Sequence, residues 1–170
     1  MSYKFAIESA KVLATYGIKS YIFESLRPTP ELSFAVRYLK CAGGIMITAS
    51  HNPKEHNGYK VYDDTGCQLL PEAADQVVQY VNEVEDELNI KVFSDEEAYP
   101  YMTWIGEEVD EAYYQEVMAI EINPGMDKKD FKIVFSPQHG TSNLPVRNCL
   151  SRLGYNVIPV LAQCAPDPDF

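Results

Sequence analysis

The sequence lacks the features of a membrane protein or a secreted protein. No stretch of its 170 residues approaches the roughly 20 consecutive apolar positions that a membrane-spanning helix needs. The N-terminal segment carries Glu8 and Lys11 inside its apolar pattern, so it is not the hydrophobic core of a secretory signal peptide. We therefore expect no membrane partner and a cytoplasmic location.

Basic residues are also few. The sequence contains 14 Lys and Arg against 25 Asp and Glu, which gives a formal net charge of −11. A nucleic-acid backbone would repel a protein of this charge overall, so we expect no nucleic-acid partner. A phosphate ester would need a local cluster of basic side chains, for which Arg27, Lys54 and Lys60 are the candidates.

Cysteine and histidine show no spacing that is typical of a metal site. The four cysteines are Cys41, Cys67, Cys149 and Cys164. They form no CxxC motif and no matching Cys/His pairs, so we expect free thiols or core residues. His51 and His56 are separated by Pro53, which disfavours a helix between them, so a zinc pair is not expected.

Alternating helix and strand patterns predict two α/β units, each a sheet layered with helices. We expect helices at 4–16, 30–39, 71–88, 108–122 and 144–153, and strands at 18–23, 45–47, 59–62, 131–135 and 155–161. The residues expected on the inner faces of the second and third helices are Phe34, Ala35, Tyr38, Leu39, Ala74, Val77, Val78, Val81 and Val84. The weak pattern at 89–108 is interpreted as the join, which divides the chain into 1–107 and 108–170.

A repeated order of helix, glycine and strand surrounds Gly17 and Gly154, each at the position that follows a helix end. In the second copy a strand and a polar loop precede the helix, whereas the first copy starts almost at residue 1. A parallel βαβ unit needs that preceding strand. We therefore expect the chain to begin inside a domain, and residues 165–170 to be a linker at a domain boundary.

Residues 43–63 concentrate the polar chemistry of the chain. A short apolar strand ends at Thr48, and a loop then presents Ser50, His51, Asn52 and Lys54 before the next strand. Ligands of α/β proteins commonly bind at such strand ends. Backbone N–H groups and lysine can hold phosphate there, so the residues alone leave two interpretations open, a phosphate or sugar site and a polar surface loop.

A serine hydrolase is not favoured by the same residues. No GxSxG motif surrounds Ser50, and no Asp partner is indicated. Adjacent side chains such as Ser50 and His51 are expected to point apart, which disfavours a catalytic pair.

The loop TASHNP at 48–53, followed by NGYK at 57–60, resembles the active-site signature of the α-D-phosphohexomutase superfamily, the phosphoglucomutases and phosphomannomutases. RPTP at 27–30 resembles the segment that precedes it there, and SPQHGT at 136–141 is similar to a strand and loop of the second domain. The run 27–62 is most similar to bacterial phosphoglucomutases and phosphopentomutases. The resemblance implies two three-layer α/β/α units with mixed, mainly parallel sheets, the first truncated at its N-terminus.

The resemblance also implies roles for five residues. Ser50 would be the phosphoserine that gives its phosphoryl group to a sugar phosphate and regains one from a bisphosphorylated intermediate. Its phosphoryl oxygen would be one ligand of Mg²⁺. Ser50, Lys60 and His51 would be the catalytic residues, and Lys60 would transfer a proton or neutralise phosphate. His51 and Asn52 would also shape the loop and bind substrate. Arg27 would support the phosphate site. A glucose 1,6-bisphosphate-type activator is implied as well.

Several parts of the family's machinery do not occur in this sequence. These are the three aspartates of a DxDxD metal loop, a sugar-selecting Glu loop and a phosphate-gripping fourth domain. The motif Asp167-Pro168-Asp169 resembles the junction before the third domain. We therefore expect domains III and IV of the same polypeptide to complete the site, and the chain alone to lack turnover. The alternatives are a phosphomannomutase, a phosphopentomutase, or a catalytically inactive phosphosugar-binding domain.

Overall fold

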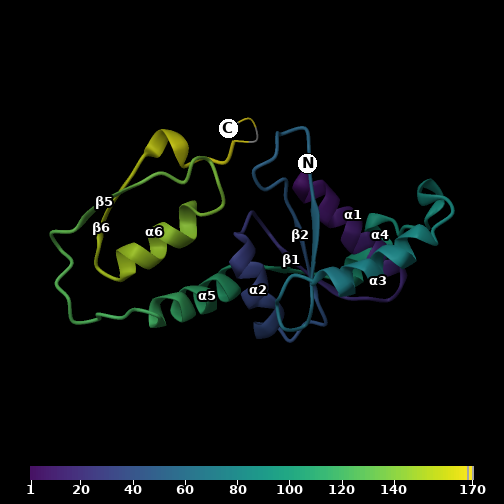
Figure 1. Ribbon diagram of the computed structural model, residues 1–170, viewed down its shortest axis with the longest axis horizontal. Helices are drawn as coiled ribbons and strands as arrows, with labels where there is room; N and C mark the ends of the chain where they lie inside the picture. The colour runs from purple at the N-terminus through teal and green to yellow at the C-terminus, as the bar shows by residue number, and fades with distance from the viewer. Residues whose placement is uncertain (168, 170) are drawn as a thin grey trace. The chain divides into compact units, whose positions relative to one another are not determined.

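The computed structural model describes residues 1–167 and 169, and it is an α/β protein (Figure 1). Pro168 and Phe170, which the sequence analysis assigned to a linker, lie outside the described residues. None of the described helices is both long enough and apolar enough to cross a lipid bilayer.

The elements follow one another in an alternating order along the chain. The helices are α1 (Ser2–Thr15), α2 (Thr29–Tyr38), α3 (Pro71–Asn82), α4 (Asp95–Ala98), α5 (Glu107–Ala119) and α6 (Asn143–Arg152). The strands are β1 (Ser20–Phe23), β2 (Gly44–Ile47), β3 (Tyr59–Tyr62), β4 (Met102–Ile105), β5 (Lys132–Phe135) and β6 (Asn156–Pro159). Three 3₁₀ turns are η1 (Glu87–Asn89), η2 (Tyr99–Tyr101) and η3 (Leu161–Gln163).

The chain forms two compact units, and one segment near the start belongs to the second of them. The first unit contains Met1–Glu24 and Leu32–Ile105, and the second contains Ser25–Glu31 and Gly106–Phe170. The division at residues 107 and 108 that the sequence suggested remains a prediction.

In the first unit, β1 and β4 pair in parallel and β2 and β3 form an antiparallel hairpin. The hairpin has one face against α2. Met46 lies opposite Lys60 on the face that also carries Gly44. A Cβ atom at Gly44 would come within 2.7 Å of a methyl group of Val36 in α2, so glycine permits this close packing.

The other face of the hairpin lies towards α1. Ile47 lies opposite Tyr59, and alternation places both on the face away from Gly44. α1 packs against β2, and its Phe5 lines a pocket together with these two residues. Helices therefore cover both faces of the hairpin, as expected for a layered α/β unit.

The helix ends confirm the predicted glycine positions. Gly17 and Gly154 have φ angles of 75° and 91°, in the left-handed region that glycine adopts readily. The amide of Ile18 donates to Leu13 at 3.1 Å, and the amide of Tyr155 donates to Leu150 at 3.1 Å. Both ends are Schellman motifs. The repeated sequence order therefore arises because α1 and α6 end in the same way.

The second unit is built on a β5–α6–β6 arrangement in which β5 and β6 pair in parallel (Figure 1). α5 packs against α6, and Val109, Tyr114 and Cys149 are buried between elements of this unit. Lys128 is buried as well, where it forms an ion pair with Glu121 and its Nζ lies 5.4 Å from the centre of the Tyr155 ring.

The region 89–108, interpreted from the sequence as the join between the two units, contains regular elements that the sequence did not predict. This region contains α4, which begins with a capping box of Ser94 and Glu97, and β4, which pairs with β1. The strand was missed because four residues with acidic neighbours give too short a pattern to identify a strand by period.

Some residues expected to be buried are exposed in the structure. Val77, Val78 and Val81 of α3, and Val84 just after it, are between 40% and 61% exposed. Tyr38 of α2 is 44% exposed. Sequence periodicity identifies an apolar face, but it does not show whether another element covers that face. α3 also ends at Asn82, six residues before the predicted end.

We predict that Gly66→Ala destabilises the first unit more than Gly17→Ala does. Both glycines have positive φ angles, but a Cβ at Gly66 would also clash with the Ser33 carbonyl oxygen, whereas open space surrounds Gly17. We expect a loss of about 1–2 kcal/mol for Gly17→Ala and of about 3 kcal/mol or more for Gly66→Ala. Urea unfolding followed by fluorescence of Trp104, the one tryptophan of the sequence, measures both. Equal losses would contradict the predicted clash.

Candidate active site

The loop between β2 and β3 is closed at its base by a short backbone contact. The Thr48 amide donates to the Gly58 carbonyl at 3.0 Å, one step beyond the last strand pair. A Cβ atom at Gly58 would lie only 2.7 Å from the Thr48 carbonyl oxygen. Glycine is therefore required where the two strands enter the loop.

A tight turn presents Ser50 at the end of β2. The Ser50 amide donates to the Thr48 hydroxyl at 2.9 Å, and the Asn52 amide donates to the Ala49 carbonyl at 3.0 Å. Ser50 has a φ angle of 55°, in the left-handed region, which is uncommon for a residue other than glycine. Such strained positions often occur at functional sites, and the Ser50 side chain is exposed.

The expectation that Ser50 and His51 point apart is wrong. The Ser50 Oγ lies 3.3 Å from the His51 Nδ1, which is within hydrogen-bond reach. The left-handed backbone of Ser50 changes the direction of its side chain relative to that of His51. In the described part of the chain no carboxylate hydrogen bonds to the His51 ring, so this pair lacks the third member of a hydrolase triad.

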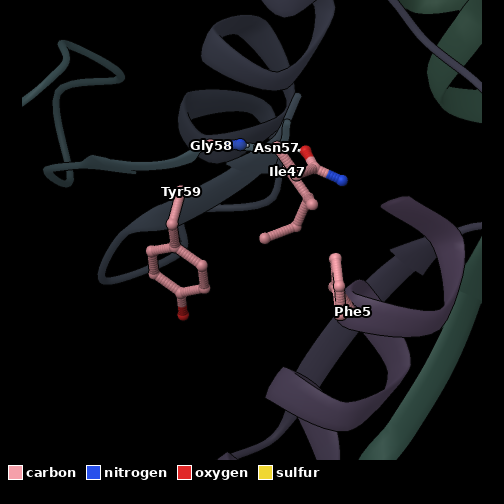
Figure 2. A pocket seen from close by; sticks show the side chains of 5 residues that line it. All are labelled: Phe5, Ile47, Asn57, Gly58 and Tyr59. Atoms are coloured by element: carbon pink, nitrogen blue, oxygen red, sulfur yellow. Dashed lines mark hydrogen bonds between the residues drawn. The ribbon is translucent and has the colours of Figure 1, made fainter. Parts of the chain in front are cut away.

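Asn57 links the far end of the loop to the start of α1. Its Oδ1 accepts from the Gly58 amide at 2.9 Å, and its Nδ2 donates to the Ser2 hydroxyl at 3.1 Å. Beside it lies a mainly apolar pocket of about 200 Å³. Figure 2 shows its lining, with Phe5 of α1 across the pocket from Ile47, Asn57, Gly58 and Tyr59.

The other predicted site residues of the first unit occupy different positions around this loop. Asn52 is exposed, and its backbone amide donates to the Ala49 carbonyl within the turn. Lys60 is half-buried on β3, opposite Met46, on the face of the hairpin that packs against α2. The structure therefore brings Ser50 and His51 together and puts Lys60 on the face opposite the Phe5 pocket.

Arg27 belongs to the second unit, where its guanidinium group lies beside the carboxyl groups of Asp110 and Glu31. Its Nε and Nη2 each donate to a different oxygen of Asp110 at 2.6 Å, a two-pronged pair, and its Nη1 donates to the Leu26 carbonyl at 3.1 Å. Burial raises the pKa of Asp110, but hydrogen bonds from Arg27 and Glu31 and the charge of Arg27 outweigh burial and hold that pKa below its usual range. Sequence analysis missed Asp110, because nothing distinguishes it from the other acids of α5.

Comparisons with known proteins identify the family. A family model for the phosphoglucomutase/phosphomannomutase α/β/α domain I matches residues 1–88, and the model for domain II of the same family matches residues 111–170. The chain belongs to the phosphoglucomutase/phosphomannomutase family. This confirms the resemblance that the loop at 48–60 and the segments around it suggested.

Individual relatives agree with the family models. A phosphoglucomutase of Staphylococcus saprophyticus is 42% identical over 176 residues, and one of Staphylococcus epidermidis strain RP62A is 41% identical over 172 residues. Each alignment covers 100% of this chain and 31% of the relative, so the chain spans about a third of the length of these relatives. A crystal structure of a Thermus thermophilus protein assigned as a phosphomannomutase superposes with a TM-score of 0.70 at 29% identity, covering 92% of this chain and 33% of that one.

This agreement confirms the predicted α/β fold of the domain I and domain II type, with its short parallel sheets. The second family motif, at 136–141, adopts the same turn as the Ser50 loop. The Gln138 amide donates to the Ser136 hydroxyl at 3.1 Å, and the Gly140 amide donates to Pro137 at 2.9 Å. His139 is bound within the unit, because its amide donates to Gln163 at 2.8 Å and its Nδ1 lies 2.9 Å from the Ala165 carbonyl oxygen. These bonds give His139 a structural role in holding the loop to the end of the unit.

All four cysteines are free, which confirms the prediction of free thiols. Residues 1–167 and 169 contain no group of three or more His, Cys, Asp or Glu side chains that could hold a metal ion. The described residues therefore offer Mg²⁺ no complete set of protein ligands.

We predict that Thr48→Val loosens the turn that presents Ser50. Valine keeps the shape of threonine but removes the hydroxyl that accepts from the Ser50 amide at 2.9 Å. Exchange of the Ser50 amide hydrogen, measured by NMR, should become about fivefold faster, as expected for the loss of one hydrogen bond of about 1 kcal/mol. Thr103→Val on the exposed side of β4 is the control. An unchanged Ser50 exchange rate would show that this bond does not hold the turn.

Proposed function

We propose that this chain is part of a phosphosugar mutase and carries its phosphoserine loop. The whole protein would interconvert a sugar 1-phosphate and the 6-phosphate through a bisphosphorylated intermediate. One observation carries this proposal: Ser50 is exposed in a left-handed turn at the end of a strand, inside a chain that matches the family model of domain I. Glucose phosphate is the proposed substrate, because the similar Staphylococcus proteins are named phosphoglucomutases.

The proposed reaction uses Ser50 as a carrier of the phosphoryl group. In the first step the bond from phosphorus to the Ser50 Oγ breaks, and a bond from phosphorus to a sugar hydroxyl oxygen forms. The proton of that hydroxyl leaves the sugar, and a proton is returned to the Ser50 Oγ. After the bisphosphate turns over, its other phosphoryl group moves back to Ser50 by the same exchange of bonds.

The surrounding residues have proposed roles in this exchange. His51 can hold a proton near Ser50, because its Nδ1 lies 3.3 Å from the Ser50 Oγ. Asn52 would bind substrate beside it, and Lys60 would transfer a proton or neutralise phosphate charge. Arg27 would support the phosphate site rather than bind phosphate directly, because Asp110 already occupies two of its donors.

The rest of the site would come from outside this chain. The phosphoryl oxygen on Ser50 would supply one ligand to Mg²⁺, which stabilises charge on a phosphoryl group when it is bound. We propose that domains III and IV supply the remaining metal and sugar ligands. In this chain we assign residues 1–107 to domain I and residues 108–170 to domain II. A glucose 1,6-bisphosphate-type activator would phosphorylate Ser50. We propose a cytoplasmic location for the whole protein.

Other functions remain as alternatives. Similarity to the Thermus thermophilus protein assigned as a phosphomannomutase favours mannose phosphate as a second candidate substrate, and a pentose phosphate is a third. A different class of function is a phosphosugar-binding domain that keeps the loop without the chemistry. That alternative predicts binding of glucose 1-phosphate with no phosphorylated Ser50.

We predict that Ser50→Ala abolishes phosphorylation and turnover in the whole protein. Alanine has no oxygen to carry the phosphoryl group, so glucose 1-phosphate turnover should fall by about a thousandfold or more. Intact-mass measurement after treatment with glucose 1,6-bisphosphate and Mg²⁺ should show one added phosphoryl group in the wild-type protein and none in the variant. Ser151→Ala is the matched control, because Ser151 is exposed and lies outside the loop, on α6. A phosphoryl group on Ser50→Ala would refute the assignment.

We also predict that the 170-residue chain alone does not convert glucose 1-phosphate into glucose 6-phosphate. The reason is chemical, since its described residues provide no complete set of metal ligands. A coupled assay of glucose 6-phosphate formation measures the rate, with whole Staphylococcus phosphoglucomutase as the positive control. A rate of glucose 6-phosphate formation equal to that of the positive control would contradict this prediction. Labelling of the chain by a fluorophosphonate would instead favour a serine hydrolase.

A further inference from the structure

Glu31 is an acidic side chain in an unusual position. It lies in the first turn of α2, within the Ser25–Glu31 segment of the second unit, and its relative exposure is 0%. Neither oxygen of its carboxyl group accepts a hydrogen bond from any described residue. A buried carboxylate is stable only when donors or cations satisfy both of its oxygens, so the ionised form is disfavoured here.

The nearby positive charge is already matched by another acid. Arg27 donates two hydrogen bonds of 2.6 Å to Asp110, whereas its Nε lies 3.7 Å from Glu31, too far for a hydrogen bond. An ionised Glu31 would therefore place two carboxylates next to one guanidinium. This arrangement would leave an excess negative charge in a buried site.

The other titratable groups around Glu31 do not balance that charge. The charge of Glu31 also interacts with three other groups, which are Tyr113 and Tyr114 of α5 and Cys149 of α6. Burial raises the pKa of each of these three groups, so they are neutral at pH 7 and bring no positive charge.

We propose that Glu31 is protonated at neutral pH and donates its O–H to Asp110, so that Arg27, Asp110 and Glu31 form a buried clamp between Ser25–Glu31 and α5. A protonated carboxyl group is a donor, which explains why Glu31 finds no partner as an acceptor. One proton and one guanidinium then balance two carboxyl groups. Loss of that proton to solvent breaks the hydrogen bond and leaves two carboxylates in contact.

The electrostatics of the cluster agree with this clamp. Burial, together with the hydrogen bond and the charge of Asp110, raises the pKa of Glu31 from 4.5 to about 8, against the opposing charge of Arg27. An acid whose pKa is higher in the folded state than in the unfolded state stabilises the fold fully below the unfolded pKa. That stability is lost as the pH rises from about 4.5 to about 8, and no further loss from Glu31 is expected above that value.

The direct test is a carbon-13 NMR titration of the Glu31 carboxyl group in the 170-residue chain. It needs no substitution, so it cannot fail because a variant does not fold. We expect a midpoint near pH 8 for Glu31, and an Asp110 carboxyl group that is ionised at pH 7. A Glu31 midpoint near the ordinary value of 4.5 would overturn the proposal.

A stability measurement on two variants tests the clamp itself. Glu31→Gln keeps a donor to Asp110 but cannot ionise, and Glu108→Gln, at an exposed position of α5, is the matched control. Between the two pKa values the folded-to-unfolded ratio of the wild-type chain should lose about a factor of ten per pH unit through Glu31. The Glu31→Gln variant should lack this component, and Glu108→Gln should keep it. Parallel pH profiles for the wild type and Glu31→Gln would overturn the proposal.

Discussion

The antiparallel pairing of β2 with β3 determines the geometry of the candidate site. Gly44 pairs with Tyr62 and Ile47 pairs with Tyr59, and the bond between Thr48 and Gly58 continues the hairpin by one more step. A slip of β3 by one residue would exchange the two faces of that strand. Lys60 would then lie towards α1, and Tyr59 would lie towards α2. Close packing at Gly44 and at Gly58 prevents such a slip, because neither position has space for a Cβ atom.

The hairpin also explains why a strained serine is tolerated. Ser50 lies three residues after the last strand pair, where the Thr48 hydroxyl accepts from the Ser50 amide and the Asn52 amide donates to Ala49. These local bonds compensate for a left-handed φ angle that a serine rarely adopts. The consequence is an exposed serine whose hydroxyl group lies close to His51 and is positioned by local bonds.

Sequence alone was sufficient for features that depend on local chemistry. Gly17 and Gly154 were predicted from the helix ends that they terminate, and β3 was predicted with its bounds, since alternation and Asn57-Gly58 are local signals. The proximity of Ser50 to His51 was not predictable, because it depends on one backbone angle. Asp110 was missed because its partner Arg27 lies 83 positions away in sequence. The exposure of Val81 was missed for a similar reason, since periodicity does not reveal what packs against a face.

The position of Arg27 shows that a family motif can contain residues that hold the fold together as well as residues proposed to contact the substrate. A guanidinium group that binds phosphate needs N–H donors that a ligand can reach. Arg27 instead donates two hydrogen bonds to Asp110, and its side chain is only 8% exposed. An arginine buried in this way is expensive unless carboxyl groups match its charge. Asp110 supplies the match, and a neutral Glu31 would add a hydrogen bond without adding charge. The RPTP segment is therefore better explained as the anchor of the start of α2 than as a phosphate contact.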